Sequence, residues 1–152
     1  MSTTIMQPNS ESQNLQKYKK RHNARLLAAQ CLYSWLVTHT PIIEAKAAVL
    51  MLPEMRGLDF DEEFFQYLTH AVINSHEELD AKLTPFIKMG VESLHPIERT
   101  IAWMAVVELK AEPKLVPASI IINEAVELTK ELSDHNAHKF INAVLDNLAK
   151  SL

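Results

Sequence analysis

The sequence predicts an all-α protein. Only two of the 152 residues are glycine, and long runs of Ala, Leu, Glu and Lys favour helix over sheet. Apolar residues recur at helical spacing, whereas no stretch of useful length alternates apolar and polar residues as a strand does. Hydrophobic residues make up 47% and charged residues 22%, so the composition is that of one ordinary globular domain, large enough to bury a core.

Prolines separate the helical patterns. Six of them stand where a pattern starts or has just ended, namely Pro41, Pro53, Pro85, Pro96, Pro113 and Pro117. Between them we predict seven helices, at about 19–39, 42–52, 60–74, 75–85, 95–110, 117–132 and 134–148. Residues 53–61 are predicted to form a loop in which Gly57 is the turn residue.

The first predicted helix has one apolar side and one polar side. Its apolar arc consists of Ala24, Leu27, Ala28, Cys31, Leu32 and Trp35. Arg21 and Arg25 border this arc, and His22 and Tyr33 share the neighbouring face. Further along the chain, Ser75 and Glu78 form a capping-box pattern, which predicts that a new helix begins there.

The three C-terminal helices differ in their apolar patterns. The helix that opens at His95-Pro96 is apolar nearly all round, which predicts a central helix covered on several sides. The helix after Pro117 has a face that we interpret as solvated, with Glu124, Glu127 and Glu131. Ser133 or Asp134 is predicted to cap the last helix, whose apolar stripe consists of Ala137, Phe140, Ile141, Val144, Leu145 and Leu148.

The ends of the chain and its single cysteine bear on where the protein acts. Residues 1–16 have no positive charge and no apolar core, so we expect a disordered polar tail rather than a secretory signal, followed by one helical domain at 17–152. The longest apolar runs are far too short to span a bilayer. Cys31 cannot form an intramolecular disulfide, which fits a reducing cytosol. We therefore expect a soluble, cytoplasmic protein without membrane contact.

No arrangement of residues in the sequence indicates catalysis. There is no Gly-rich phosphate loop, no G-x-S-x-G and no C-x-x-C. His135 and His138 could share a helix face, but no third ligand stands nearby, and H-N-A-H differs from the zinc-hydrolase motif H-E-x-x-H. We expect neither an enzyme nor a metal site nor a bound cofactor.

A basic cluster at the start of the first helix is the strongest functional signal. Five of the fifteen Lys and Arg residues fall within nine positions of a chain whose net charge is −4, and they are Lys17, Lys19, Lys20, Arg21 and Arg25. A localised basic patch on an acidic body indicates contact with a polyanion such as nucleic acid. The alternative is a solvated, charged helix start without a ligand.

Four motifs resemble the NusB family of transcription antitermination factors. The N-terminal signature of the family is similar to K-R-H-N-A-R-L-L-A-A-Q-C-L-Y-S-W at 20–35. Three more segments match in the same order, namely E-R-T-I-A-W-M-A-V-V-E-L, V-P-A-S-I-I-I-N-E-A-V-E-L-T-K and H-K-F-I-N-A-V-L-D. Together the motifs cover the chain from about Lys19 to Leu148, and the last two form a specific pair.

This resemblance implies a fold and a set of partners. The fold would be all-helical, with two small helical subdomains packed together, and the protein would not be an enzyme. It would pair with the small-subunit ribosomal protein that acts as NusE, and the heterodimer would bind a single-stranded boxA element in nascent ribosomal RNA transcripts. With other Nus factors on RNA polymerase, the complex would suppress premature termination. A homodimer of the free protein stays open.

The resemblance also implies roles for individual positions. The arginine-rich start of the family falls on Arg21, His22, Asn23 and Arg25, two of which are not arginine here. The implied RNA contacts are Lys19, Lys20, Arg21, His22, Arg25, Lys139 and Phe140. Tyr33 and Glu98 match contacts of the partner protein.

Several of these positions have a structural alternative. Glu98 stands in the first turn of its helix, where a carboxylate is favoured by the helix dipole. Phe140 falls in an apolar stripe and could be a core residue, and Lys139 could be an ordinary surface lysine.

Two other functions compete with RNA binding. The first is a protein-interaction scaffold, which could self-associate and in which the basic cluster meets an acidic partner. The second is an accessory domain of an RNA methyltransferase, and the lack of a catalytic domain after Leu152 argues against it.

Overall fold

The computed structural model describes residues 10–114, 116–134 and 136–152, and within these ranges all regular structure is helical. The prediction of an all-α fold is therefore confirmed. The α-helices are α1 (Ser10–Thr38), α2 (Ile42–Leu50), α3 (Glu62–Leu83), α4 (Pro96–Leu109), α5 (Ala118–Leu132) and α6 (Ala137–Ser151). Three short 3₁₀ helices connect them, at η1 (Pro53–Met55), η2 (Thr84–Phe86) and η3 (Val91–Ser93). None of the helices in this part of the chain is both long and apolar enough to cross a membrane.

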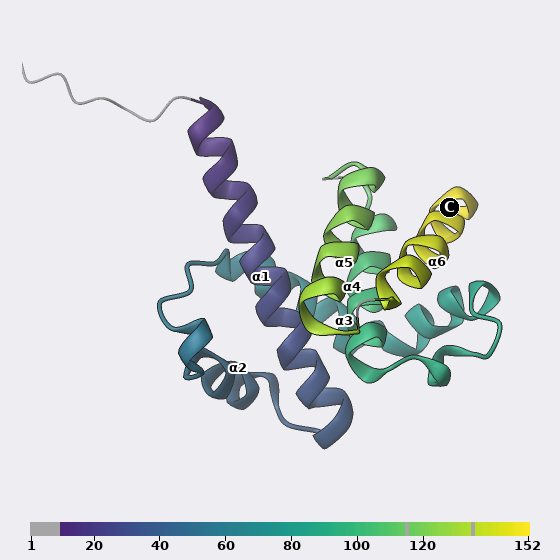
Figure 1. Cartoon of the computed structure of the whole chain (residues 1–152), viewed down its shortest axis with the longest axis horizontal. Coiled ribbons are helices and arrows are strands. Elements are labelled where there is room, and N and C mark those ends of the chain that lie inside the picture. Colours follow the sequence, from purple (N-terminus) through teal and green to yellow (C-terminus); the bar gives the residue numbers. More distant parts are fainter. Residues whose placement is uncertain (1–9, 115, 135) are drawn as a thin grey trace, which may run out of the picture.

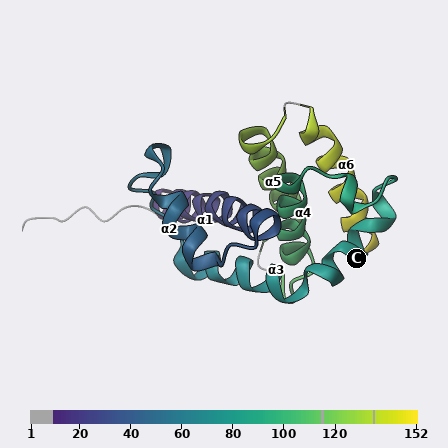
Figure 2. The same ribbon diagram turned by 90° about the horizontal axis from the view of Figure 1, so that it is seen from below.

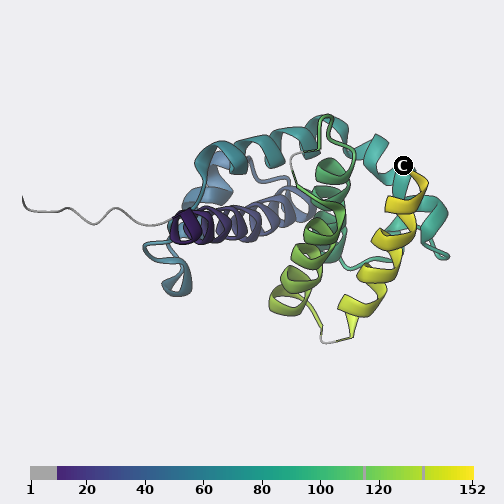
Figure 3. The same ribbon diagram turned by 90° about the horizontal axis from the view of Figure 1, so that it is seen from above.

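The helices form two groups that share α4 and α3 (Figure 1). Seen from below and from above, α1 and α2 lie on one side of the molecule, α5 and α6 lie on the other, and α3 runs along both (Figures 2 and 3). Helix α4 contacts α1, α3, α5 and α6, which makes it the central element.

Helix α4 confirms the prediction of a central helix. Every residue from Thr100 to Leu109 is buried, and Trp103 is 0% exposed. His95 caps the start of the helix, because its Nδ1 accepts a hydrogen bond of 3.3 Å from the backbone of Ile97. Pro96 follows at the first helical position, where it loses no helical hydrogen bond.

The predicted helices at 60–74 and 75–85 both lie within α3, which has a kink at the predicted boundary and is counted as one helix, so the described residues form six α-helices instead of the seven predicted. Ser75 interrupts α3 with a non-helical backbone (φ −138°, ψ 18°), so the chain bends at the predicted boundary but does not stop. The hydroxyl of Ser75 donates to the carbonyl of Ala71 at 2.5 Å instead of capping a new helix.

Helix α1 begins earlier than predicted. It starts at Ser10, so residues 10–16, which were assigned to a disordered tail, are helical and exposed. The segment lacks Gly and Pro, and Glu11 in the first turn interacts favourably with the helix dipole, so nothing local stops the helix from extending. The other tail residues, 1–9, lie outside the described part of the chain.

Candidate nucleic-acid and partner interface

The basic half of α1 presents its lysines to solvent. Lys17, Lys19 and Lys20 are all exposed, so an external polyanion can reach them. The ammonium group of Lys20 lies 3.8 Å from the carboxylate of Asp59, and both side chains are largely exposed. Because an exposed ion pair of this kind contributes little stability, a phosphate oxygen can replace the carboxylate at low cost.

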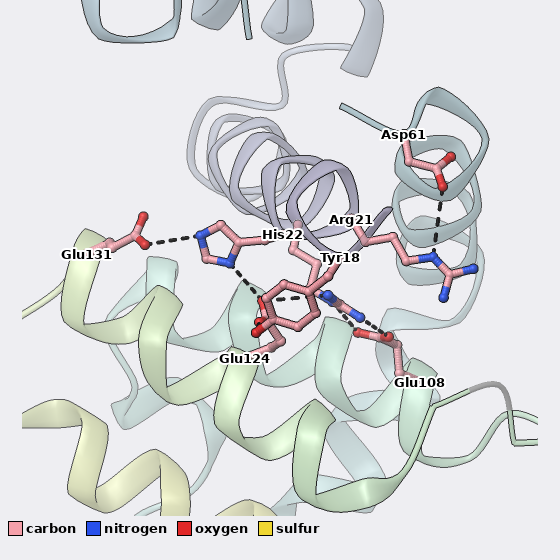
Figure 4. Close-up of polar contacts among 8 residues, drawn as sticks. Tyr18, Arg21, His22, Asp61, Glu108, Glu124 and Glu131 are labelled. Atoms are coloured by element: carbon pink, nitrogen blue, oxygen red, sulfur yellow. Dashed lines mark hydrogen bonds and ion pairs between the residues drawn. The ribbon is translucent and has the colours of Figure 1, made fainter. Parts of the chain in front are cut away.

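Arg21 lies on the side of α1 that faces the start of α3. Its guanidinium carbon is 5.2 Å from the centre of the Phe64 ring, and its Nε is 3.9 Å from a carboxylate oxygen of Asp61 (Figure 4). That separation is too long for a hydrogen bond, and the buried Nε has no other hydrogen-bond partner among the described residues. Arg21 is thus held in place by a ring and a charge, with its Nε buried and its side chain 27% exposed.

Arg25 does not reach the surface, which corrects its prediction as an RNA contact. Its side chain is 3% exposed and donates two hydrogen bonds to Glu108 on α4, at 2.9 and 2.8 Å. A third nitrogen lies 3.6 Å from Glu124 on α5. Burial alone would lower the pKa of Arg25, but the hydrogen bond and the negative charge of Glu108 outweigh it and raise the pKa. Arg25 therefore joins α1 to α4 and α5.

His22 is also committed to partners inside the protein. Its Nδ1 lies 2.8 Å from Glu124 and its Nε2 lies 3.1 Å from Glu131, both on α5 (Figure 4). The hydrogen bond to Glu124 raises the pKa of His22, although partial burial opposes this shift. Because both ring nitrogens are hydrogen-bonded to α5, His22 attaches α1 to α5 and has no ring nitrogen left for an RNA contact.

Glu124 is the acceptor on which these contacts converge. We predicted that Glu124 lies on a solvated face of α5, and this is wrong, because Glu124 is 1% exposed. Glu131, from the same predicted face, is exposed. Burial would raise the pKa of Glu124, but hydrogen bonds from His22 and Tyr18 and the charge of Arg25 outweigh it and lower the pKa. The Tyr18 hydroxyl donates to Glu124, and this hydrogen bond raises the pKa of Tyr18 to about 12.

Sequence reasoning missed Tyr18, Glu108 and Glu124 as members of this site. Tyr18 stands within the basic cluster, but its partner on α5 is 106 positions away. Glu108 stands in a helix that is otherwise apolar, and a lone acidic residue at such a position is the one signal that could have indicated a buried ion pair.

The two predicted partner-binding residues lie around the start of α4. The half-buried ring of Tyr33 lies parallel to the ring of His95, with 6.3 Å between their centres. Glu98 is in the first turn of the same helix and accepts a hydrogen bond of 2.5 Å from Ser133, just after α5. Tyr33 and Glu98 therefore both lie near the start of α4, where α1, α4 and the end of α5 meet.

Lys139 and Phe140 lie in the first turn of α6, and both are exposed. Phe140 is 43% exposed, so the alternative that it is a core residue is wrong, and its ring can be reached by a ligand. Helix α5 separates this turn from α1 (Figure 1), so the basic cluster and the α6 residues do not form one continuous group.

No group of three metal-binding side chains comes together among the residues that the structure describes. His138 lies at the start of α6, and His135, its predicted neighbour, lies outside the described residues.

Comparison with known proteins identifies relatives along nearly the whole chain. A family model with the description NusB family matches residues 22–150. The transcription antitermination protein NusB of Pseudoalteromonas atlantica is 39% identical over 132 residues, which cover 87% of this chain and 92% of that protein. The protein of the same name from Actinobacillus succinogenes is 37% identical over 136 residues, covering 90% of this chain and 94% of its own length.

Solved structures share the fold. The solution structure of NusB from Aquifex aeolicus matches with a TM-score of 0.72 at 25% identity, over 88% of this chain and 89% of that one. A crystal structure of the antitermination factors NusB and NusE in complex with double-stranded RNA matches with a TM-score of 0.70 at 24% identity, over 86% of this chain and 96% of that one.

Proposed function

Because the chain belongs to the NusB family, we propose that it is a transcription antitermination factor that pairs with the small-subunit ribosomal protein acting as NusE. In this proposal the heterodimer binds single-stranded boxA RNA in nascent ribosomal RNA transcripts. It acts in the cytoplasm and reaches other Nus factors and RNA polymerase as part of a larger complex. The proposed activity is binding, not catalysis.

The observation that supports RNA binding most directly is the placement of the cations on α1. Lys19 and Lys20 point their charge into solvent, and Arg21 is stacked on Phe64. A guanidinium held on a ring keeps its donors in a fixed plane, which suits the two oxygens of a phosphate. Arg25 and His22 contribute indirectly, because they fix the helix that carries these cations.

The proposed partner surface rests on Tyr33, His95 and Glu98. An aromatic ring that is half-exposed beside a polar cap offers both apolar contact and hydrogen bonding, as protein interfaces commonly do. The ribosomal protein would bind where α1, α4 and the end of α5 meet.

The salt dependence of RNA binding tests the proposal. Binding of the chain, alone and with the ribosomal protein, is measured by fluorescence anisotropy on a boxA-like single-stranded RNA and on a scrambled RNA. Replacing Lys19, Lys20 and Arg21 together by Ala should weaken binding and reduce the slope of log K against log salt by about 2, because each lost phosphate contact on a single strand accounts for about 0.7.

A matched control removes a charge elsewhere. Lys88 is exposed and stands outside α1 and α6, so Lys88→Ala should leave the slope unchanged. An unchanged slope in the triple variant would show that α1 does not contact phosphate.

One observation favours the scaffold function as a second candidate. Lys20 and Arg21 already lie near carboxylates of their own chain, so an acidic protein could take the place of Asp59 and Asp61 as readily as RNA. If the heterodimer binds no RNA at any salt concentration while the complex with the ribosomal protein forms, the scaffold function holds.

A further inference from the structure

A groove of ≈ 550 Å³, lined by both polar and apolar side chains, runs between α5 and α6. The two helices lie side by side (Figures 1 and 3), and the groove is outside the contacts that hold α1 on α5. Its polar lining consists of Ser119, Asn123, His138 and Asn142, and its apolar lining consists of Ile122 and Val126. The volume falls within the roughly 300–1,000 Å³ that small-molecule sites have.

The polar lining can both donate and accept hydrogen bonds. The carboxamides of Asn123 and Asn142 are exposed and each offers an oxygen acceptor and an NH₂ donor. The Nδ1 of His138 is buried, and it has no hydrogen-bond partner among the described residues. Because this nitrogen is buried, the hydrogen bonding that the groove offers to a ligand rests on the two exposed carboxamides.

The charges of the groove exclude several ligand classes. Lys139 and Asp146 contribute one positive and one negative charge to its lining, and these two charges cancel. A phosphate would meet only one cation, and a metal ion would meet only one carboxylate. The lining instead fits a neutral, planar group with apolar faces and a hydrogen-bonding edge, and these are the properties of a nucleobase.

We propose that the groove between α5 and α6 binds an unstacked base of a single-stranded RNA. This inference rests on the proposed function, since it assigns a base contact to the strand whose phosphates contact α1. Amide side chains pair with the edges of bases, whereas the cations of α1 contact only the backbone, so the groove supplies sequence preference that α1 cannot.

A strand that passes from α1 to the groove must cross α5, which carries carboxylates. Glu131 is engaged by His22, and Glu127 lies 3.4 Å from the ammonium group of Lys130. These pairings reduce the repulsion that a phosphate would otherwise meet on the way. Lys139, at the edge of the groove, provides a cation on the far side of the helix.

Substitution of the two asparagines tests the proposal. Asn123→Ala and Asn142→Ala should each weaken binding of a boxA-like single-stranded RNA by about 5- to 150-fold, the cost of one good amide–base pair, without changing the salt slope. The control is Asn147→Ala, because Asn147 is another exposed asparagine of α6 that does not line the groove. All three positions are exposed, and far-UV circular dichroism verifies that each variant is folded.

A second measurement identifies the base. RNAs that carry an abasic nucleotide at one position at a time are titrated against the wild type and the Asn123→Ala/Asn142→Ala variant. At one position, loss of the base should weaken binding to the wild type but not to the variant, because the contact is already lost there.

The outcomes separate the groove from the proposed function. If the asparagine variants bind like the wild type while the α1 charge variant binds weakly, the groove does not take a base and the proposed function still holds. If every abasic RNA loses the same affinity for the wild type as for the Asn123→Ala/Asn142→Ala variant, the groove likewise does not take a base. If the heterodimer binds no RNA, both the groove inference and RNA binding are wrong.

Discussion

Among single residues, Arg25 has the largest structural role in the candidate site. It is buried between three helices and pairs with Glu108 through two hydrogen bonds. Taking two charges out of water is costly, so such a pair adds little net stability compared with apolar residues. Removing only one partner has a different effect, because the remaining charge is buried without compensation.

Replacement of Arg25 by Met should therefore lower the free energy of unfolding by about 3–5 kcal/mol, because Glu108 loses its partner. Urea denaturation of the two proteins measures the difference. Lys19→Met, a change at an exposed position of the same helix, should stay within about 0.5 kcal/mol of the wild type. A loss below 1 kcal/mol for Arg25→Met would contradict the role assigned to the buried pair.

His22 makes the attachment of α1 to α5 dependent on pH. Glu124 raises the pKa of His22 in the folded protein above its ordinary value of about 6.5. The stabilisation by the imidazolium is therefore fully present below the ordinary pKa and is lost as the pH rises through the folded pKa. The stability difference between the wild type and His22→Gln should decrease between pH 6 and pH 9.

The matched control for His22 is arginine, which does not titrate in this range. His22→Arg should keep its stability difference from His22→Gln across the same pH series, as measured by urea denaturation in a set of buffers. A difference between the wild type and His22→Gln that does not change with pH would exclude the imidazolium as the source of the stabilisation.

Among the elements, the start of α3 shows how a helix end also positions a functional side chain. Asp61 caps α3, because one carboxylate oxygen accepts a 3.0 Å hydrogen bond from the backbone of Phe64. Its own backbone N–H donates to the carbonyl of Lys20 at 3.1 Å, which ties the cap to α1. The other carboxylate oxygen faces Arg21.

Two substitutions of Asp61 separate its cap from its charge. Asp61→Ala should cost about 1 kcal/mol of stability through loss of the cap, whereas Asp61→Asn, which still caps, should cost about 0.5 kcal/mol or less. Asp61→Asn should also strengthen RNA binding modestly, because Arg21 loses its competing carboxylate. Thermal denaturation and anisotropy measure the two effects, and equal stability of both variants would contradict the capping role.

The elements also show how far the sequence determines the fold. Apolar spacing and proline positions were sufficient for α4, since a helix that is buried on all sides must be apolar on all sides. They were not sufficient at Ser75, because a Ser can cap a helix or bend one. Leu79 and Leu83 are buried beyond the bend, as their helical spacing indicates, but that spacing is the same whether the helix stops at Ser75 or bends there.

The candidate site, like the fold, could be predicted from the sequence only in part. Lys19 and Lys20 belong to the basic cluster that the sequence indicated as a contact with a polyanion, and both are exposed in the structure. Arg25 borders the arc, and its burial depends on Glu108, which stands 83 positions away. Contacts between distant elements are fixed by tertiary packing, so a charge count cannot tell a cation that is already paired from one that is available to a ligand.

For the whole molecule, the charge distribution explains how a basic helix sits on an acidic body. The net charge is −4, and part of the negative charge lies on α4 and α5, where Glu108, Glu124 and Glu131 contact α1. These carboxylates bind the cations on the inner side of α1. The lysines on its outer side remain in solvent, which leaves a positive surface of limited size.

Cys31 provides a probe for whether α1 leaves the molecule separately or only when the whole protein unfolds. The thiol is 0% exposed, and burial raises its pKa to about 12, so the reactive thiolate is nearly absent in the folded protein. Because α1 contacts α2, α3, α4 and α5, we expect its release to require global unfolding.

The rate of labelling of Cys31 by Ellman's reagent, measured across a urea series, should give the same free energy of unfolding as urea denaturation followed by circular dichroism. Arg25→Met should accelerate labelling by the factor that its loss of stability implies, whereas Lys19→Met should not. Labelling of the wild type that is much faster than unfolding allows would instead show that α1 opens locally, and the basic surface would then be a mobile element.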